Sequence, residues 1–130
     1  MNSPVTTTQE TVFVVDDDEA VRDSLRWLLE ANGYRVQCFS SAEQFLDAYQ
    51  PAQQAGQIAC LILDVRMSGM SGLELQERLI ADNAALPIIF VTGHGDFDTY
   101  TRVRDVGSTI PVLKPVSPQD IVNAIARVCL

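Results

Sequence analysis

The residues best suited to chemistry are three aspartates that follow short apolar runs. Asp16 and Asp17 come directly after the run 11–15, and Asp64 comes directly after the run 58–63. Two carboxylates about 4 Å apart repel each other by roughly 1 to 4 kcal/mol at effective dielectric constants between about 80 and 20. Three carboxylates that meet at one place therefore need a counter-charge. Mg²⁺ suits them because it prefers one or two carboxylates together with water and phosphate oxygens.

Thr92 and Lys114 add a hydroxyl and an amine to this set. They follow two further apolar runs, 87–91 and 110–113. A carboxylate can attack phosphorus and form an acyl phosphate, and a metal ion and a lysine can balance the charge on the phosphoryl oxygens. The sequence shows no P-loop, no Ser-His-Asp arrangement and no cluster of zinc ligands, so these residue types favour phosphoryl transfer.

Alternating strands and helices are expected to position these residues. Short apolar, β-branched runs are typical of buried parallel strands, and they occur at 11–15, 34–39, 58–63, 87–91 and 110–113. Helices are expected between them: one that stops at Gly33, one from a cap at Ser40 or Ser41 to Tyr49, two over about 71–82 and 97–106, and a last one that begins at Ser117.

Five strands that alternate with five helices predict an α/β fold, a doubly wound five-stranded parallel sheet with the flavodoxin-like order 2-1-3-4-5. Pro111 fits this order because proline within a strand belongs at a sheet edge, and the fifth strand is an edge. Ligands bind such sheets at the carboxyl ends of the strands, beside the switch point between the first and third strands. Asp16, Asp17 and Asp64 should therefore converge there.

Composition narrows the class of protein. The chain has 130 residues, of which 47 % are hydrophobic and 20 % are charged, as expected of one soluble globular domain. The net charge of -8 disfavours direct binding of nucleic acid. No apolar run approaches the roughly 20 residues that span a membrane, and no signal peptide is visible. Residues 1–10 are polar and are expected to be a disordered N-terminal segment, with one domain over 11–130.

The cysteines and the histidine predict little chemistry of their own. Cys38, Cys60 and Cys129 show no CxxC spacing, which favours reduced thiols and a cytoplasmic setting. Cys38 and Cys60 are expected to be small buried hydrophobes. His94 is the one histidine, and we expect an exposed loop residue rather than a phosphodonor.

Four segments of the chain resemble the receiver domains of bacterial two-component response regulators. They are VFVVDDDEAVRDSL, LILDVRMSGMSGLEL, PIIFVTGHGD and VLKP, and their order and spacing are specific. The VTGHGD and MSGLEL segments look most like the FixJ-type subgroup of transcriptional regulators. The resemblance covers 11–129. It implies the receiver fold, Mg²⁺ as cofactor, a sensor histidine kinase as partner, and control of transcription through a DNA-binding output domain expected to be absent from this chain.

The resemblance also implies a role for each site residue. Asp64 would be the phosphoacceptor. Asp16 and Asp17 would be the acidic pair that binds the metal with Asp64, with Asp17 the direct ligand, and Arg66 would offer its backbone carbonyl to the metal. Thr92 would be the hydroxyl that turns toward the phosphoryl group. Lys114 would contact a phosphate oxygen, with a cis peptide bond to Pro115. Such a domain accepts a phosphoryl group and dephosphorylates itself, and is otherwise no enzyme.

Three positions depart from the family pattern. Ser68 stands where the family loop often has proline, Leu113 where this subgroup often has an acidic residue, and Pro111 where the fifth strand usually has Phe or Tyr. We therefore expect the chemistry to be retained and the output surface to be atypical. A homodimer through the fourth helix and the fifth strand is implied, with Phe97 and Tyr100 on that helix. No direct contact with nucleic acid or a membrane is expected of this domain.

Two other functions remain open at this point. One is a receiver that only binds partners, which the Pro111 region favours. The other is a Mg²⁺-dependent phosphatase or phosphotransferase that acts on an external substrate. This second function would need a lid to exclude water, and the sequence has no insertion of that size.

Overall fold

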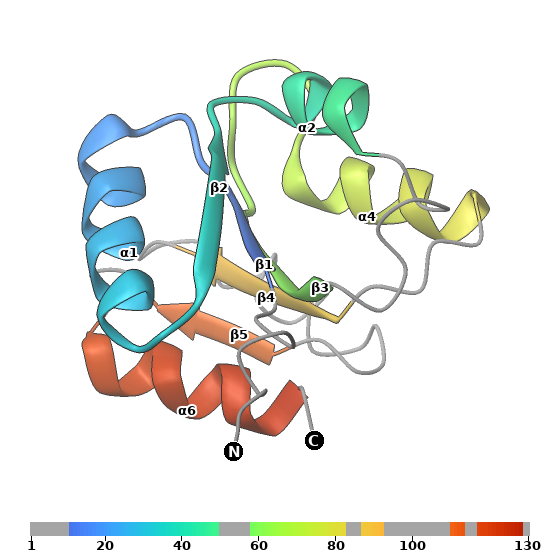
Figure 1. Cartoon of the computed structure of the whole chain (residues 1–130). Coiled ribbons are helices and arrows are strands. Elements are labelled where there is room, and N and C mark those ends of the chain that lie inside the picture. The colour runs from blue at the N-terminus through green and yellow to red at the C-terminus, as the bar shows by residue number, and fades with distance from the viewer. Residues whose placement is uncertain (1–10, 50–57, 83–86, 93–109, 114–116, 129–130) are drawn as a thin grey trace.

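The computed structural model describes residues 11–49, 58–82, 87–92, 110–113 and 117–128, and strands alternate with helices within them (Figure 1). The strands are β1 (Thr11–Val15), β2 (Arg35–Phe39), β3 (Ile58–Asp64), β4 (Ile88–Thr92) and β5 (Ile110–Leu113). The helices are α1 (Glu19–Ala31), α2 (Ala42–Ala48), α4 (Gly72–Ala81) and α6 (Pro118–Val128). The segment 1–10 and the helix expected over about 97–106 lie outside the described residues.

The five strands form one parallel sheet in the order β2-β1-β3-β4-β5. This confirms the predicted α/β class and strand order. Val15 of β1 is in register with Leu63 of β3, so the residues that follow these two positions lie at the same edge of the sheet. Pro111 lies on the edge strand β5, opposite Phe90 of β4, as expected of a proline within a strand.

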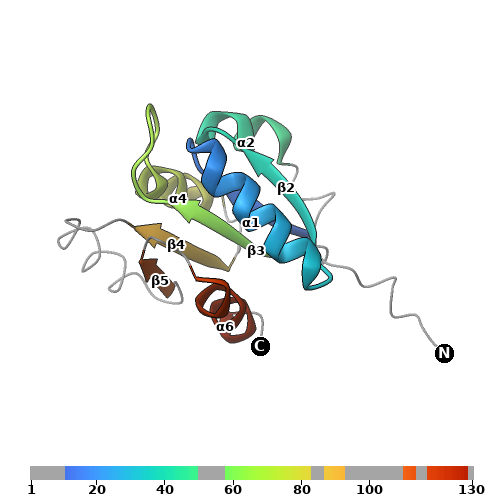
Figure 2. The same cartoon turned by 90° about the vertical axis from the view of Figure 1, so that its left-hand side faces the viewer.

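Helices cover both faces of the sheet. Figures 1 and 2 show α1 and α6 on one face and α2 and α4 on the other. Successive strand side chains point to opposite faces, so β1, β3 and β4 each contribute to two cores. The core under α1 and α6 is mainly aliphatic, with Val12, Val14, Leu25, Leu29, Ile62, Ile121 and Ile125. The core under α2 and α4 is richer in aromatic rings, with Phe13, Phe45 and Phe90 beside Leu61, Leu63, Leu75 and Leu79.

Short polar side chains begin the helices, and caps at Ser40 or Ser41 and at Ser117 were predicted from the sequence. Asp18 caps α1, Ser41 caps α2, and Ser71 caps α4. Ser41, rather than Ser40, is therefore the cap of the second helix. The Oγ of Ser117 accepts a hydrogen bond from Asp120 N at 3.1 Å at the start of α6. Side-chain oxygens at these positions satisfy amide groups that have no partner within the helix.

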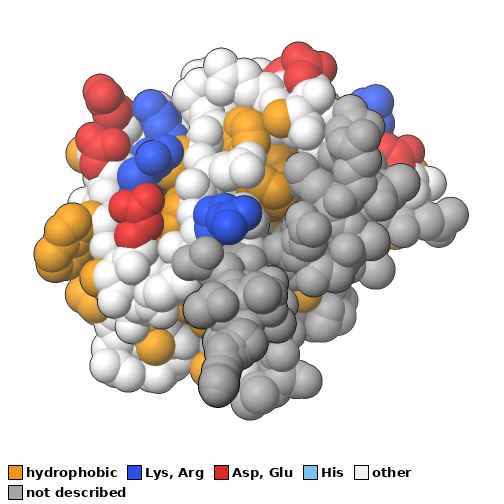
Figure 3. All heavy atoms as spheres, in the orientation of Figure 1, with side chains coloured by type: hydrophobic (Ala, Val, Ile, Leu, Met, Phe, Trp, Pro, Cys, Tyr) orange, Lys and Arg blue, Asp and Glu red, His pale blue; other side chains and the backbone are white. Residues whose placement is uncertain are grey.

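The surface carries one large apolar side chain on α1. Trp27 is 74 % exposed. On the face shown in Figure 3, acidic and basic side chains lie beside each other over α1. None of the helices within the described ranges has the length and apolar character needed to cross a membrane.

The cysteine prediction is half right. Cys60 is fully buried, and both Cys60 and Cys38 are free thiols. Cys38, however, is only partly buried. It lies on β2, an edge strand, and the helices cover an edge strand less completely than a central one. Cys129 lies outside the described residues.

Candidate functional site

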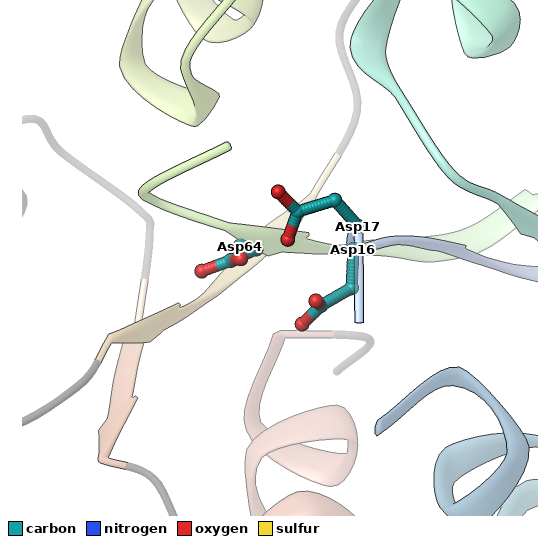
Figure 4. A group of neighbouring side chains, drawn as sticks. All are labelled: Asp16, Asp17 and Asp64. Carbon is teal, nitrogen blue, oxygen red and sulfur yellow. The ribbon is translucent and has the colours of Figure 1, made fainter. Parts of the chain in front are cut away.

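Three carboxylates meet at the carboxyl ends of β1 and β3. Asp16, Asp17 and Asp64 each offer one ligand atom, and these three atoms all lie within 4.8 Å of one another. Figure 4 shows the side chain of Asp17 pointing toward Asp64. Asp16 and Asp64 are buried, with 2 % and 5 % of their surface exposed, whereas Asp17 is exposed. The predicted convergence at the switch point of the sheet is therefore present.

Local hydrogen bonds hold the connection between β1 and α1. The Oδ1 of Asp16 accepts a hydrogen bond from Asp18 N at 2.9 Å, and Asp18 in turn caps α1 by accepting from Ala20 N at 2.9 Å. The guanidinium of Arg22 donates from Nη1 to the backbone carbonyl of Asp16 at 2.7 Å. Charged donors form the stronger hydrogen bonds in proteins, so Arg22 fixes the backbone that presents the first two carboxylates.

Close packing holds the backbone at the end of β3. The Oδ1 of Asp64 accepts a hydrogen bond from Arg66 N at 3.3 Å. Gly72, the first residue of α4, donates from its N–H to Val65 O at 3.0 Å. A Cβ atom at position 72 would collide with the carbonyl oxygen of Asp64. Glycine is therefore required for α4 to begin against the backbone of the site.

The segment between β3 and α4, residues 65–71, is called here the β3–α4 loop. Within it, Ser68 N donates to the Oδ2 of Asp17 at 3.3 Å, and Met70 N donates to the Oε2 of Glu43 at 3.2 Å. Proline has no N–H, so the first of these bonds depends on the departure from the family pattern at Ser68. The two bonds tie the loop to β1 and to α2.

Three contacts of the site were not anticipated from sequence, those of Arg22, Glu43 and Gly72. Arg22 and Gly72 lie inside the segments that carry the family resemblance, so their motif positions offered a signal. Glu43 carried no such signal, because it lies in an ordinary first turn of α2, outside those segments. Its contact with the β3–α4 loop becomes visible only when α2 is packed on the sheet.

The carboxylate group fits a small divalent cation. Carboxylate oxygens are among the ligands that Mg²⁺ prefers, and Asp16, Asp17 and Asp64 would supply them from ligand atoms within 4.8 Å of one another. Three carboxylates this close together repel one another, and a cation bound among them would relieve that repulsion. The donor set therefore suits Mg²⁺.

The remaining predicted residues are placed only in part. Thr92 is the last residue of β4, in register with Leu113 of β5, and nothing is described of its side chain. Lys114, which follows Leu113, lies outside the described residues, as do Pro115 and His94. Arg66 is exposed and is the second residue of the β3–α4 loop, directly after Val65. The backbone thus places Thr92 at the same sheet edge as Asp64, since Asp64 is in register with Val91.

Comparisons with known proteins identify relatives of this chain. It matches the response regulator receiver domain over residues 12–126. It is 41 % identical over 119 residues to the response regulator protein TmoT of Ectopseudomonas mendocina, which covers 90 % of this chain and 51 % of that protein. It is 40 % identical over 109 residues to the transcriptional regulatory protein FixJ of Bradyrhizobium diazoefficiens, which covers 84 % of this chain and 51 % of that protein.

A solved structure shows the same architecture. The response regulator StyR superposes with a TM-score of 0.82 at 43 % identity, over 93 % of this chain and 59 % of that chain. The chain spans about half the length of the curated relatives it matches.

An open parallel sheet with an acidic group at its switch point is a flavodoxin-like α/β domain. The match over residues 12–126 shows that the chain belongs to the response regulator receiver domain family of two-component systems. Several of its relatives are transcriptional regulators. The resemblance to this family predicted from the sequence is confirmed.

Proposed function

We propose that this chain is a phosphorylation-dependent switch that accepts a phosphoryl group on Asp64 from a sensor histidine kinase, with Mg²⁺ bound at the acidic site. The observation that carries this proposal is the meeting of Asp16, Asp17 and Asp64, with ligand atoms within 4.8 Å, in a chain of the receiver family. Such a group requires a cation when a further anion, the phosphoryl group, arrives.

The transfer is a substitution at phosphorus. A carboxylate oxygen of Asp64 attacks the phosphorus of a phosphohistidine, the P–N bond breaks, and its electron pair returns to the imidazole nitrogen. An acyl phosphate on Asp64 is the product. Mg²⁺, when bound, neutralises charge on the phosphoryl oxygens. The hydrogen bond from Arg66 N to Asp64 Oδ1 limits the rotation of the attacking carboxylate.

The other site residues take the roles that the family resemblance implies. Asp16, Asp17 and the backbone carbonyl of Arg66 complete the metal site with Asp64. Thr92, at the end of β4, and Lys114, directly after β5, respond to the new phosphoryl group. β4 and β5 are hydrogen-bonded neighbours in the sheet, so a displacement of one strand should displace the other.

The downstream role follows from the relatives. We propose that the switch controls transcription through an output domain, because the similar proteins are transcriptional regulators and this chain spans about half their length. Its own chemistry is limited to accepting the phosphoryl group and losing it by hydrolysis. A homodimer through the segment 97–106 and β5 would carry the signal, with a modified surface where Pro111 replaces an aromatic residue.

Intact mass measurement tests the proposal. The protein is incubated with Mg²⁺ and acetyl phosphate, and we expect the mass of one added phosphoryl group. The adduct should be absent in Asp64→Asn and in the wild type treated with a chelator. Asp47→Asn is the matched control, because Asp47 is an exposed aspartate of α2 away from the site, and it should be modified as the wild type is. An adduct that persists in Asp64→Asn, or no adduct in the wild type, would refute the proposed function.

A further inference from the structure

Glu43 lies on α2, a helix that contributes none of the three carboxylates, yet it reaches the β3–α4 loop. Its Oε2 accepts a hydrogen bond from Met70 N at 3.2 Å, across 27 positions of sequence. Figure 1 shows the loop after β3 rising beside α2 before it returns to α4. The bond therefore joins an exposed carboxylate of one helix to the backbone that follows the end of β3.

Gly69, the neighbour of Met70, is adapted to the same contact. Its φ of 78° is the left-handed conformation that side chains other than glycine rarely adopt. A Cβ atom at this position would also lie only 3.1 Å from Glu43 Oε2. A larger residue would thus strain the backbone and press on the carboxylate. Two adjacent residues of the loop therefore contact the carboxylate of Glu43: Gly69 leaves space for it, and Met70 donates a hydrogen bond to it.

The position of Met70 is linked to the acidic site through Ser68. Only one residue, Gly69, separates Met70 from Ser68, whose N–H donates to Asp17 Oδ2 at 3.3 Å. On the other side of Met70, Ser71 and Glu74 form a capping box that fixes the start of α4. The capping box holds the backbone on the α4 side of Met70. A shift of the Met70 backbone should therefore move Ser68 and its hydrogen bond with Asp17 rather than the start of α4.

Packing and capping fix the position of α2, the helix that carries Glu43. Phe45 of α2 is fully buried, and its ring packs edge-on against Phe13 of β1 at a centroid distance of 5.4 Å. Ser41 accepts a hydrogen bond from Gln44 N at 3.1 Å at the start of the same helix. Glu43 is therefore presented to the loop from an element whose own position is fixed by packing against the sheet.

We propose that Glu43 is a positioning residue, which holds the β3–α4 loop so that Asp17 and the backbone of Arg66 keep the arrangement that binds the metal ion. The proposal rests on the proposed function for the identity of the ion. The hydrogen bond needs an acceptor oxygen rather than a charge, so a glutamine at this position can replace the glutamate. Loss of the oxygen should loosen the loop and weaken the binding of Mg²⁺.

Three variants test the role of the oxygen. Glu43→Ala removes the acceptor, Glu43→Gln keeps an acceptor oxygen without the charge, and Asp47→Ala removes one negative charge from the exposed side of the same helix. Amide exchange at Met70, followed by NMR without metal, should accelerate in Glu43→Ala and remain near the wild-type rate in the other two variants. The Kd for Mg²⁺, from titration calorimetry, should rise about three- to tenfold in Glu43→Ala alone, the range expected for one hydrogen bond.

The outcomes separate this proposal from the proposed function. If Met70 exchange and Mg²⁺ binding in Glu43→Ala equal those of the wild type, Glu43 holds nothing and the positioning role is wrong. The role is also wrong if Glu43→Gln is as impaired as Glu43→Ala, because charge would then be the cause. If the wild type itself does not bind Mg²⁺, the proposed function fails. Faster exchange at Met70 in Glu43→Ala alone would still support the contact between α2 and the loop.

Discussion

The two connections that bring carboxylates to the site are held in different ways. The β1–α1 connection is short, Asp16–Asp18, and the hydrogen bonds from Asp18 N to Asp16, from Ala20 N to Asp18 and from Arg22 to the carbonyl of Asp16 span two to six positions. The β3–α4 loop, residues 65–71, is longer, and its backbone N–H groups donate hydrogen bonds to Asp17 and Glu43, which lie 51 and 27 positions away in sequence.

This difference separates what is built locally from what depends on tertiary packing. A connection closed by its own residues forms as soon as its strand and helix are in place. The position of the β3–α4 loop depends in addition on α2 and the β1–α1 connection, to which it is hydrogen-bonded. We therefore expect substitutions that release one of these bonds of the loop to alter metal binding, and a substitution that releases the bond of Arg22 to alter stability first.

The largest effect is expected from Gly72→Ala, at the first residue of α4, directly after the β3–α4 loop. The new Cβ meets the backbone of Asp64 and Val65, which cannot rotate away as a side chain could. The free energy of unfolding should fall by about 3 kcal/mol, as in an overpacked core, and Mg²⁺ binding should weaken. Urea denaturation and titration calorimetry measure the two quantities.

Gly33→Ala is the control for this prediction. Gly33 has a φ of 90°, but a Cβ there would contact nothing within 4 Å. This variant should lose about 1 kcal/mol of stability from backbone strain and bind Mg²⁺ as the wild type does. Equal effects of both variants on Mg²⁺ binding would contradict a specific role for Gly72 at the site.

Arg22→Met probes the β1–α1 connection. It removes the charged donor to the carbonyl of Asp16 and should lower the free energy of unfolding by about 1 to 2 kcal/mol. Arg78→Met removes the same charge from an exposed position of α4, where its ion pair with Asp82 is screened by solvent, and should change it by less than about 0.5 kcal/mol. Thermal or urea unfolding compares them, and similar losses would mean that net charge, rather than this hydrogen bond, is responsible.

Ser68→Pro tests the link between the two connections. Proline removes the N–H that donates to Asp17, whereas Ser68→Ala keeps it and removes only the hydroxyl. The family resemblance implies that proline is tolerated in this loop, so we expect the fold to be kept and the effect to be small. Because one hydrogen bond to Asp17 is lost, the Kd for Mg²⁺ should rise about two- to fivefold in Ser68→Pro. It should stay within error in Ser68→Ala, which keeps that bond. An equal Kd for Mg²⁺ in the two variants would contradict this prediction. It would mean that the hydrogen bond to Glu43, rather than the one to Asp17, holds the loop.

The smallest effect is expected at alkaline pH. Burial raises the pKa of the Tyr49 hydroxyl, at the end of α2, above its ordinary value. The unfolded chain then loses this proton first, at about pH 10, so stability should fall as pH rises from there through the folded pKa, and not below it. Urea denaturation at several pH values should show a weaker alkaline loss in Tyr49→Phe than in the wild type. Parallel curves for the two proteins would contradict this prediction.

The sequence predicted the features that depend on local pattern. Buried β-branched runs revealed the strands, and the alternation of strands and helices predicted the sheet order. The position of Asp64 at the end of its apolar run was enough to place it beside Asp16. These predictions succeed because parallel strands bring their carboxyl ends to one edge, whatever the details of the loops.

Features that depend on contacts between distant segments escaped prediction. Glu43 is an ordinary surface glutamate until α2 lies beside the β3–α4 loop. The need for glycine at position 72 arises from a close approach of two backbones, which no local pattern reveals. Cys38 was expected to be buried because its neighbours are apolar, but the exposure of an edge strand is decided by what packs on it.

The uneven burial of the three carboxylates affects how an ion arrives. Asp16 and Asp64 have already given up most of their hydration when the chain folds, while Asp17 still faces water. Mg²⁺ dehydrates reluctantly. If the site binds Mg²⁺ as proposed, Asp17 would be the carboxylate that a hydrated ion reaches from solvent, and the rate of ion exchange should depend more on Asp17 than on Asp16 or Asp64.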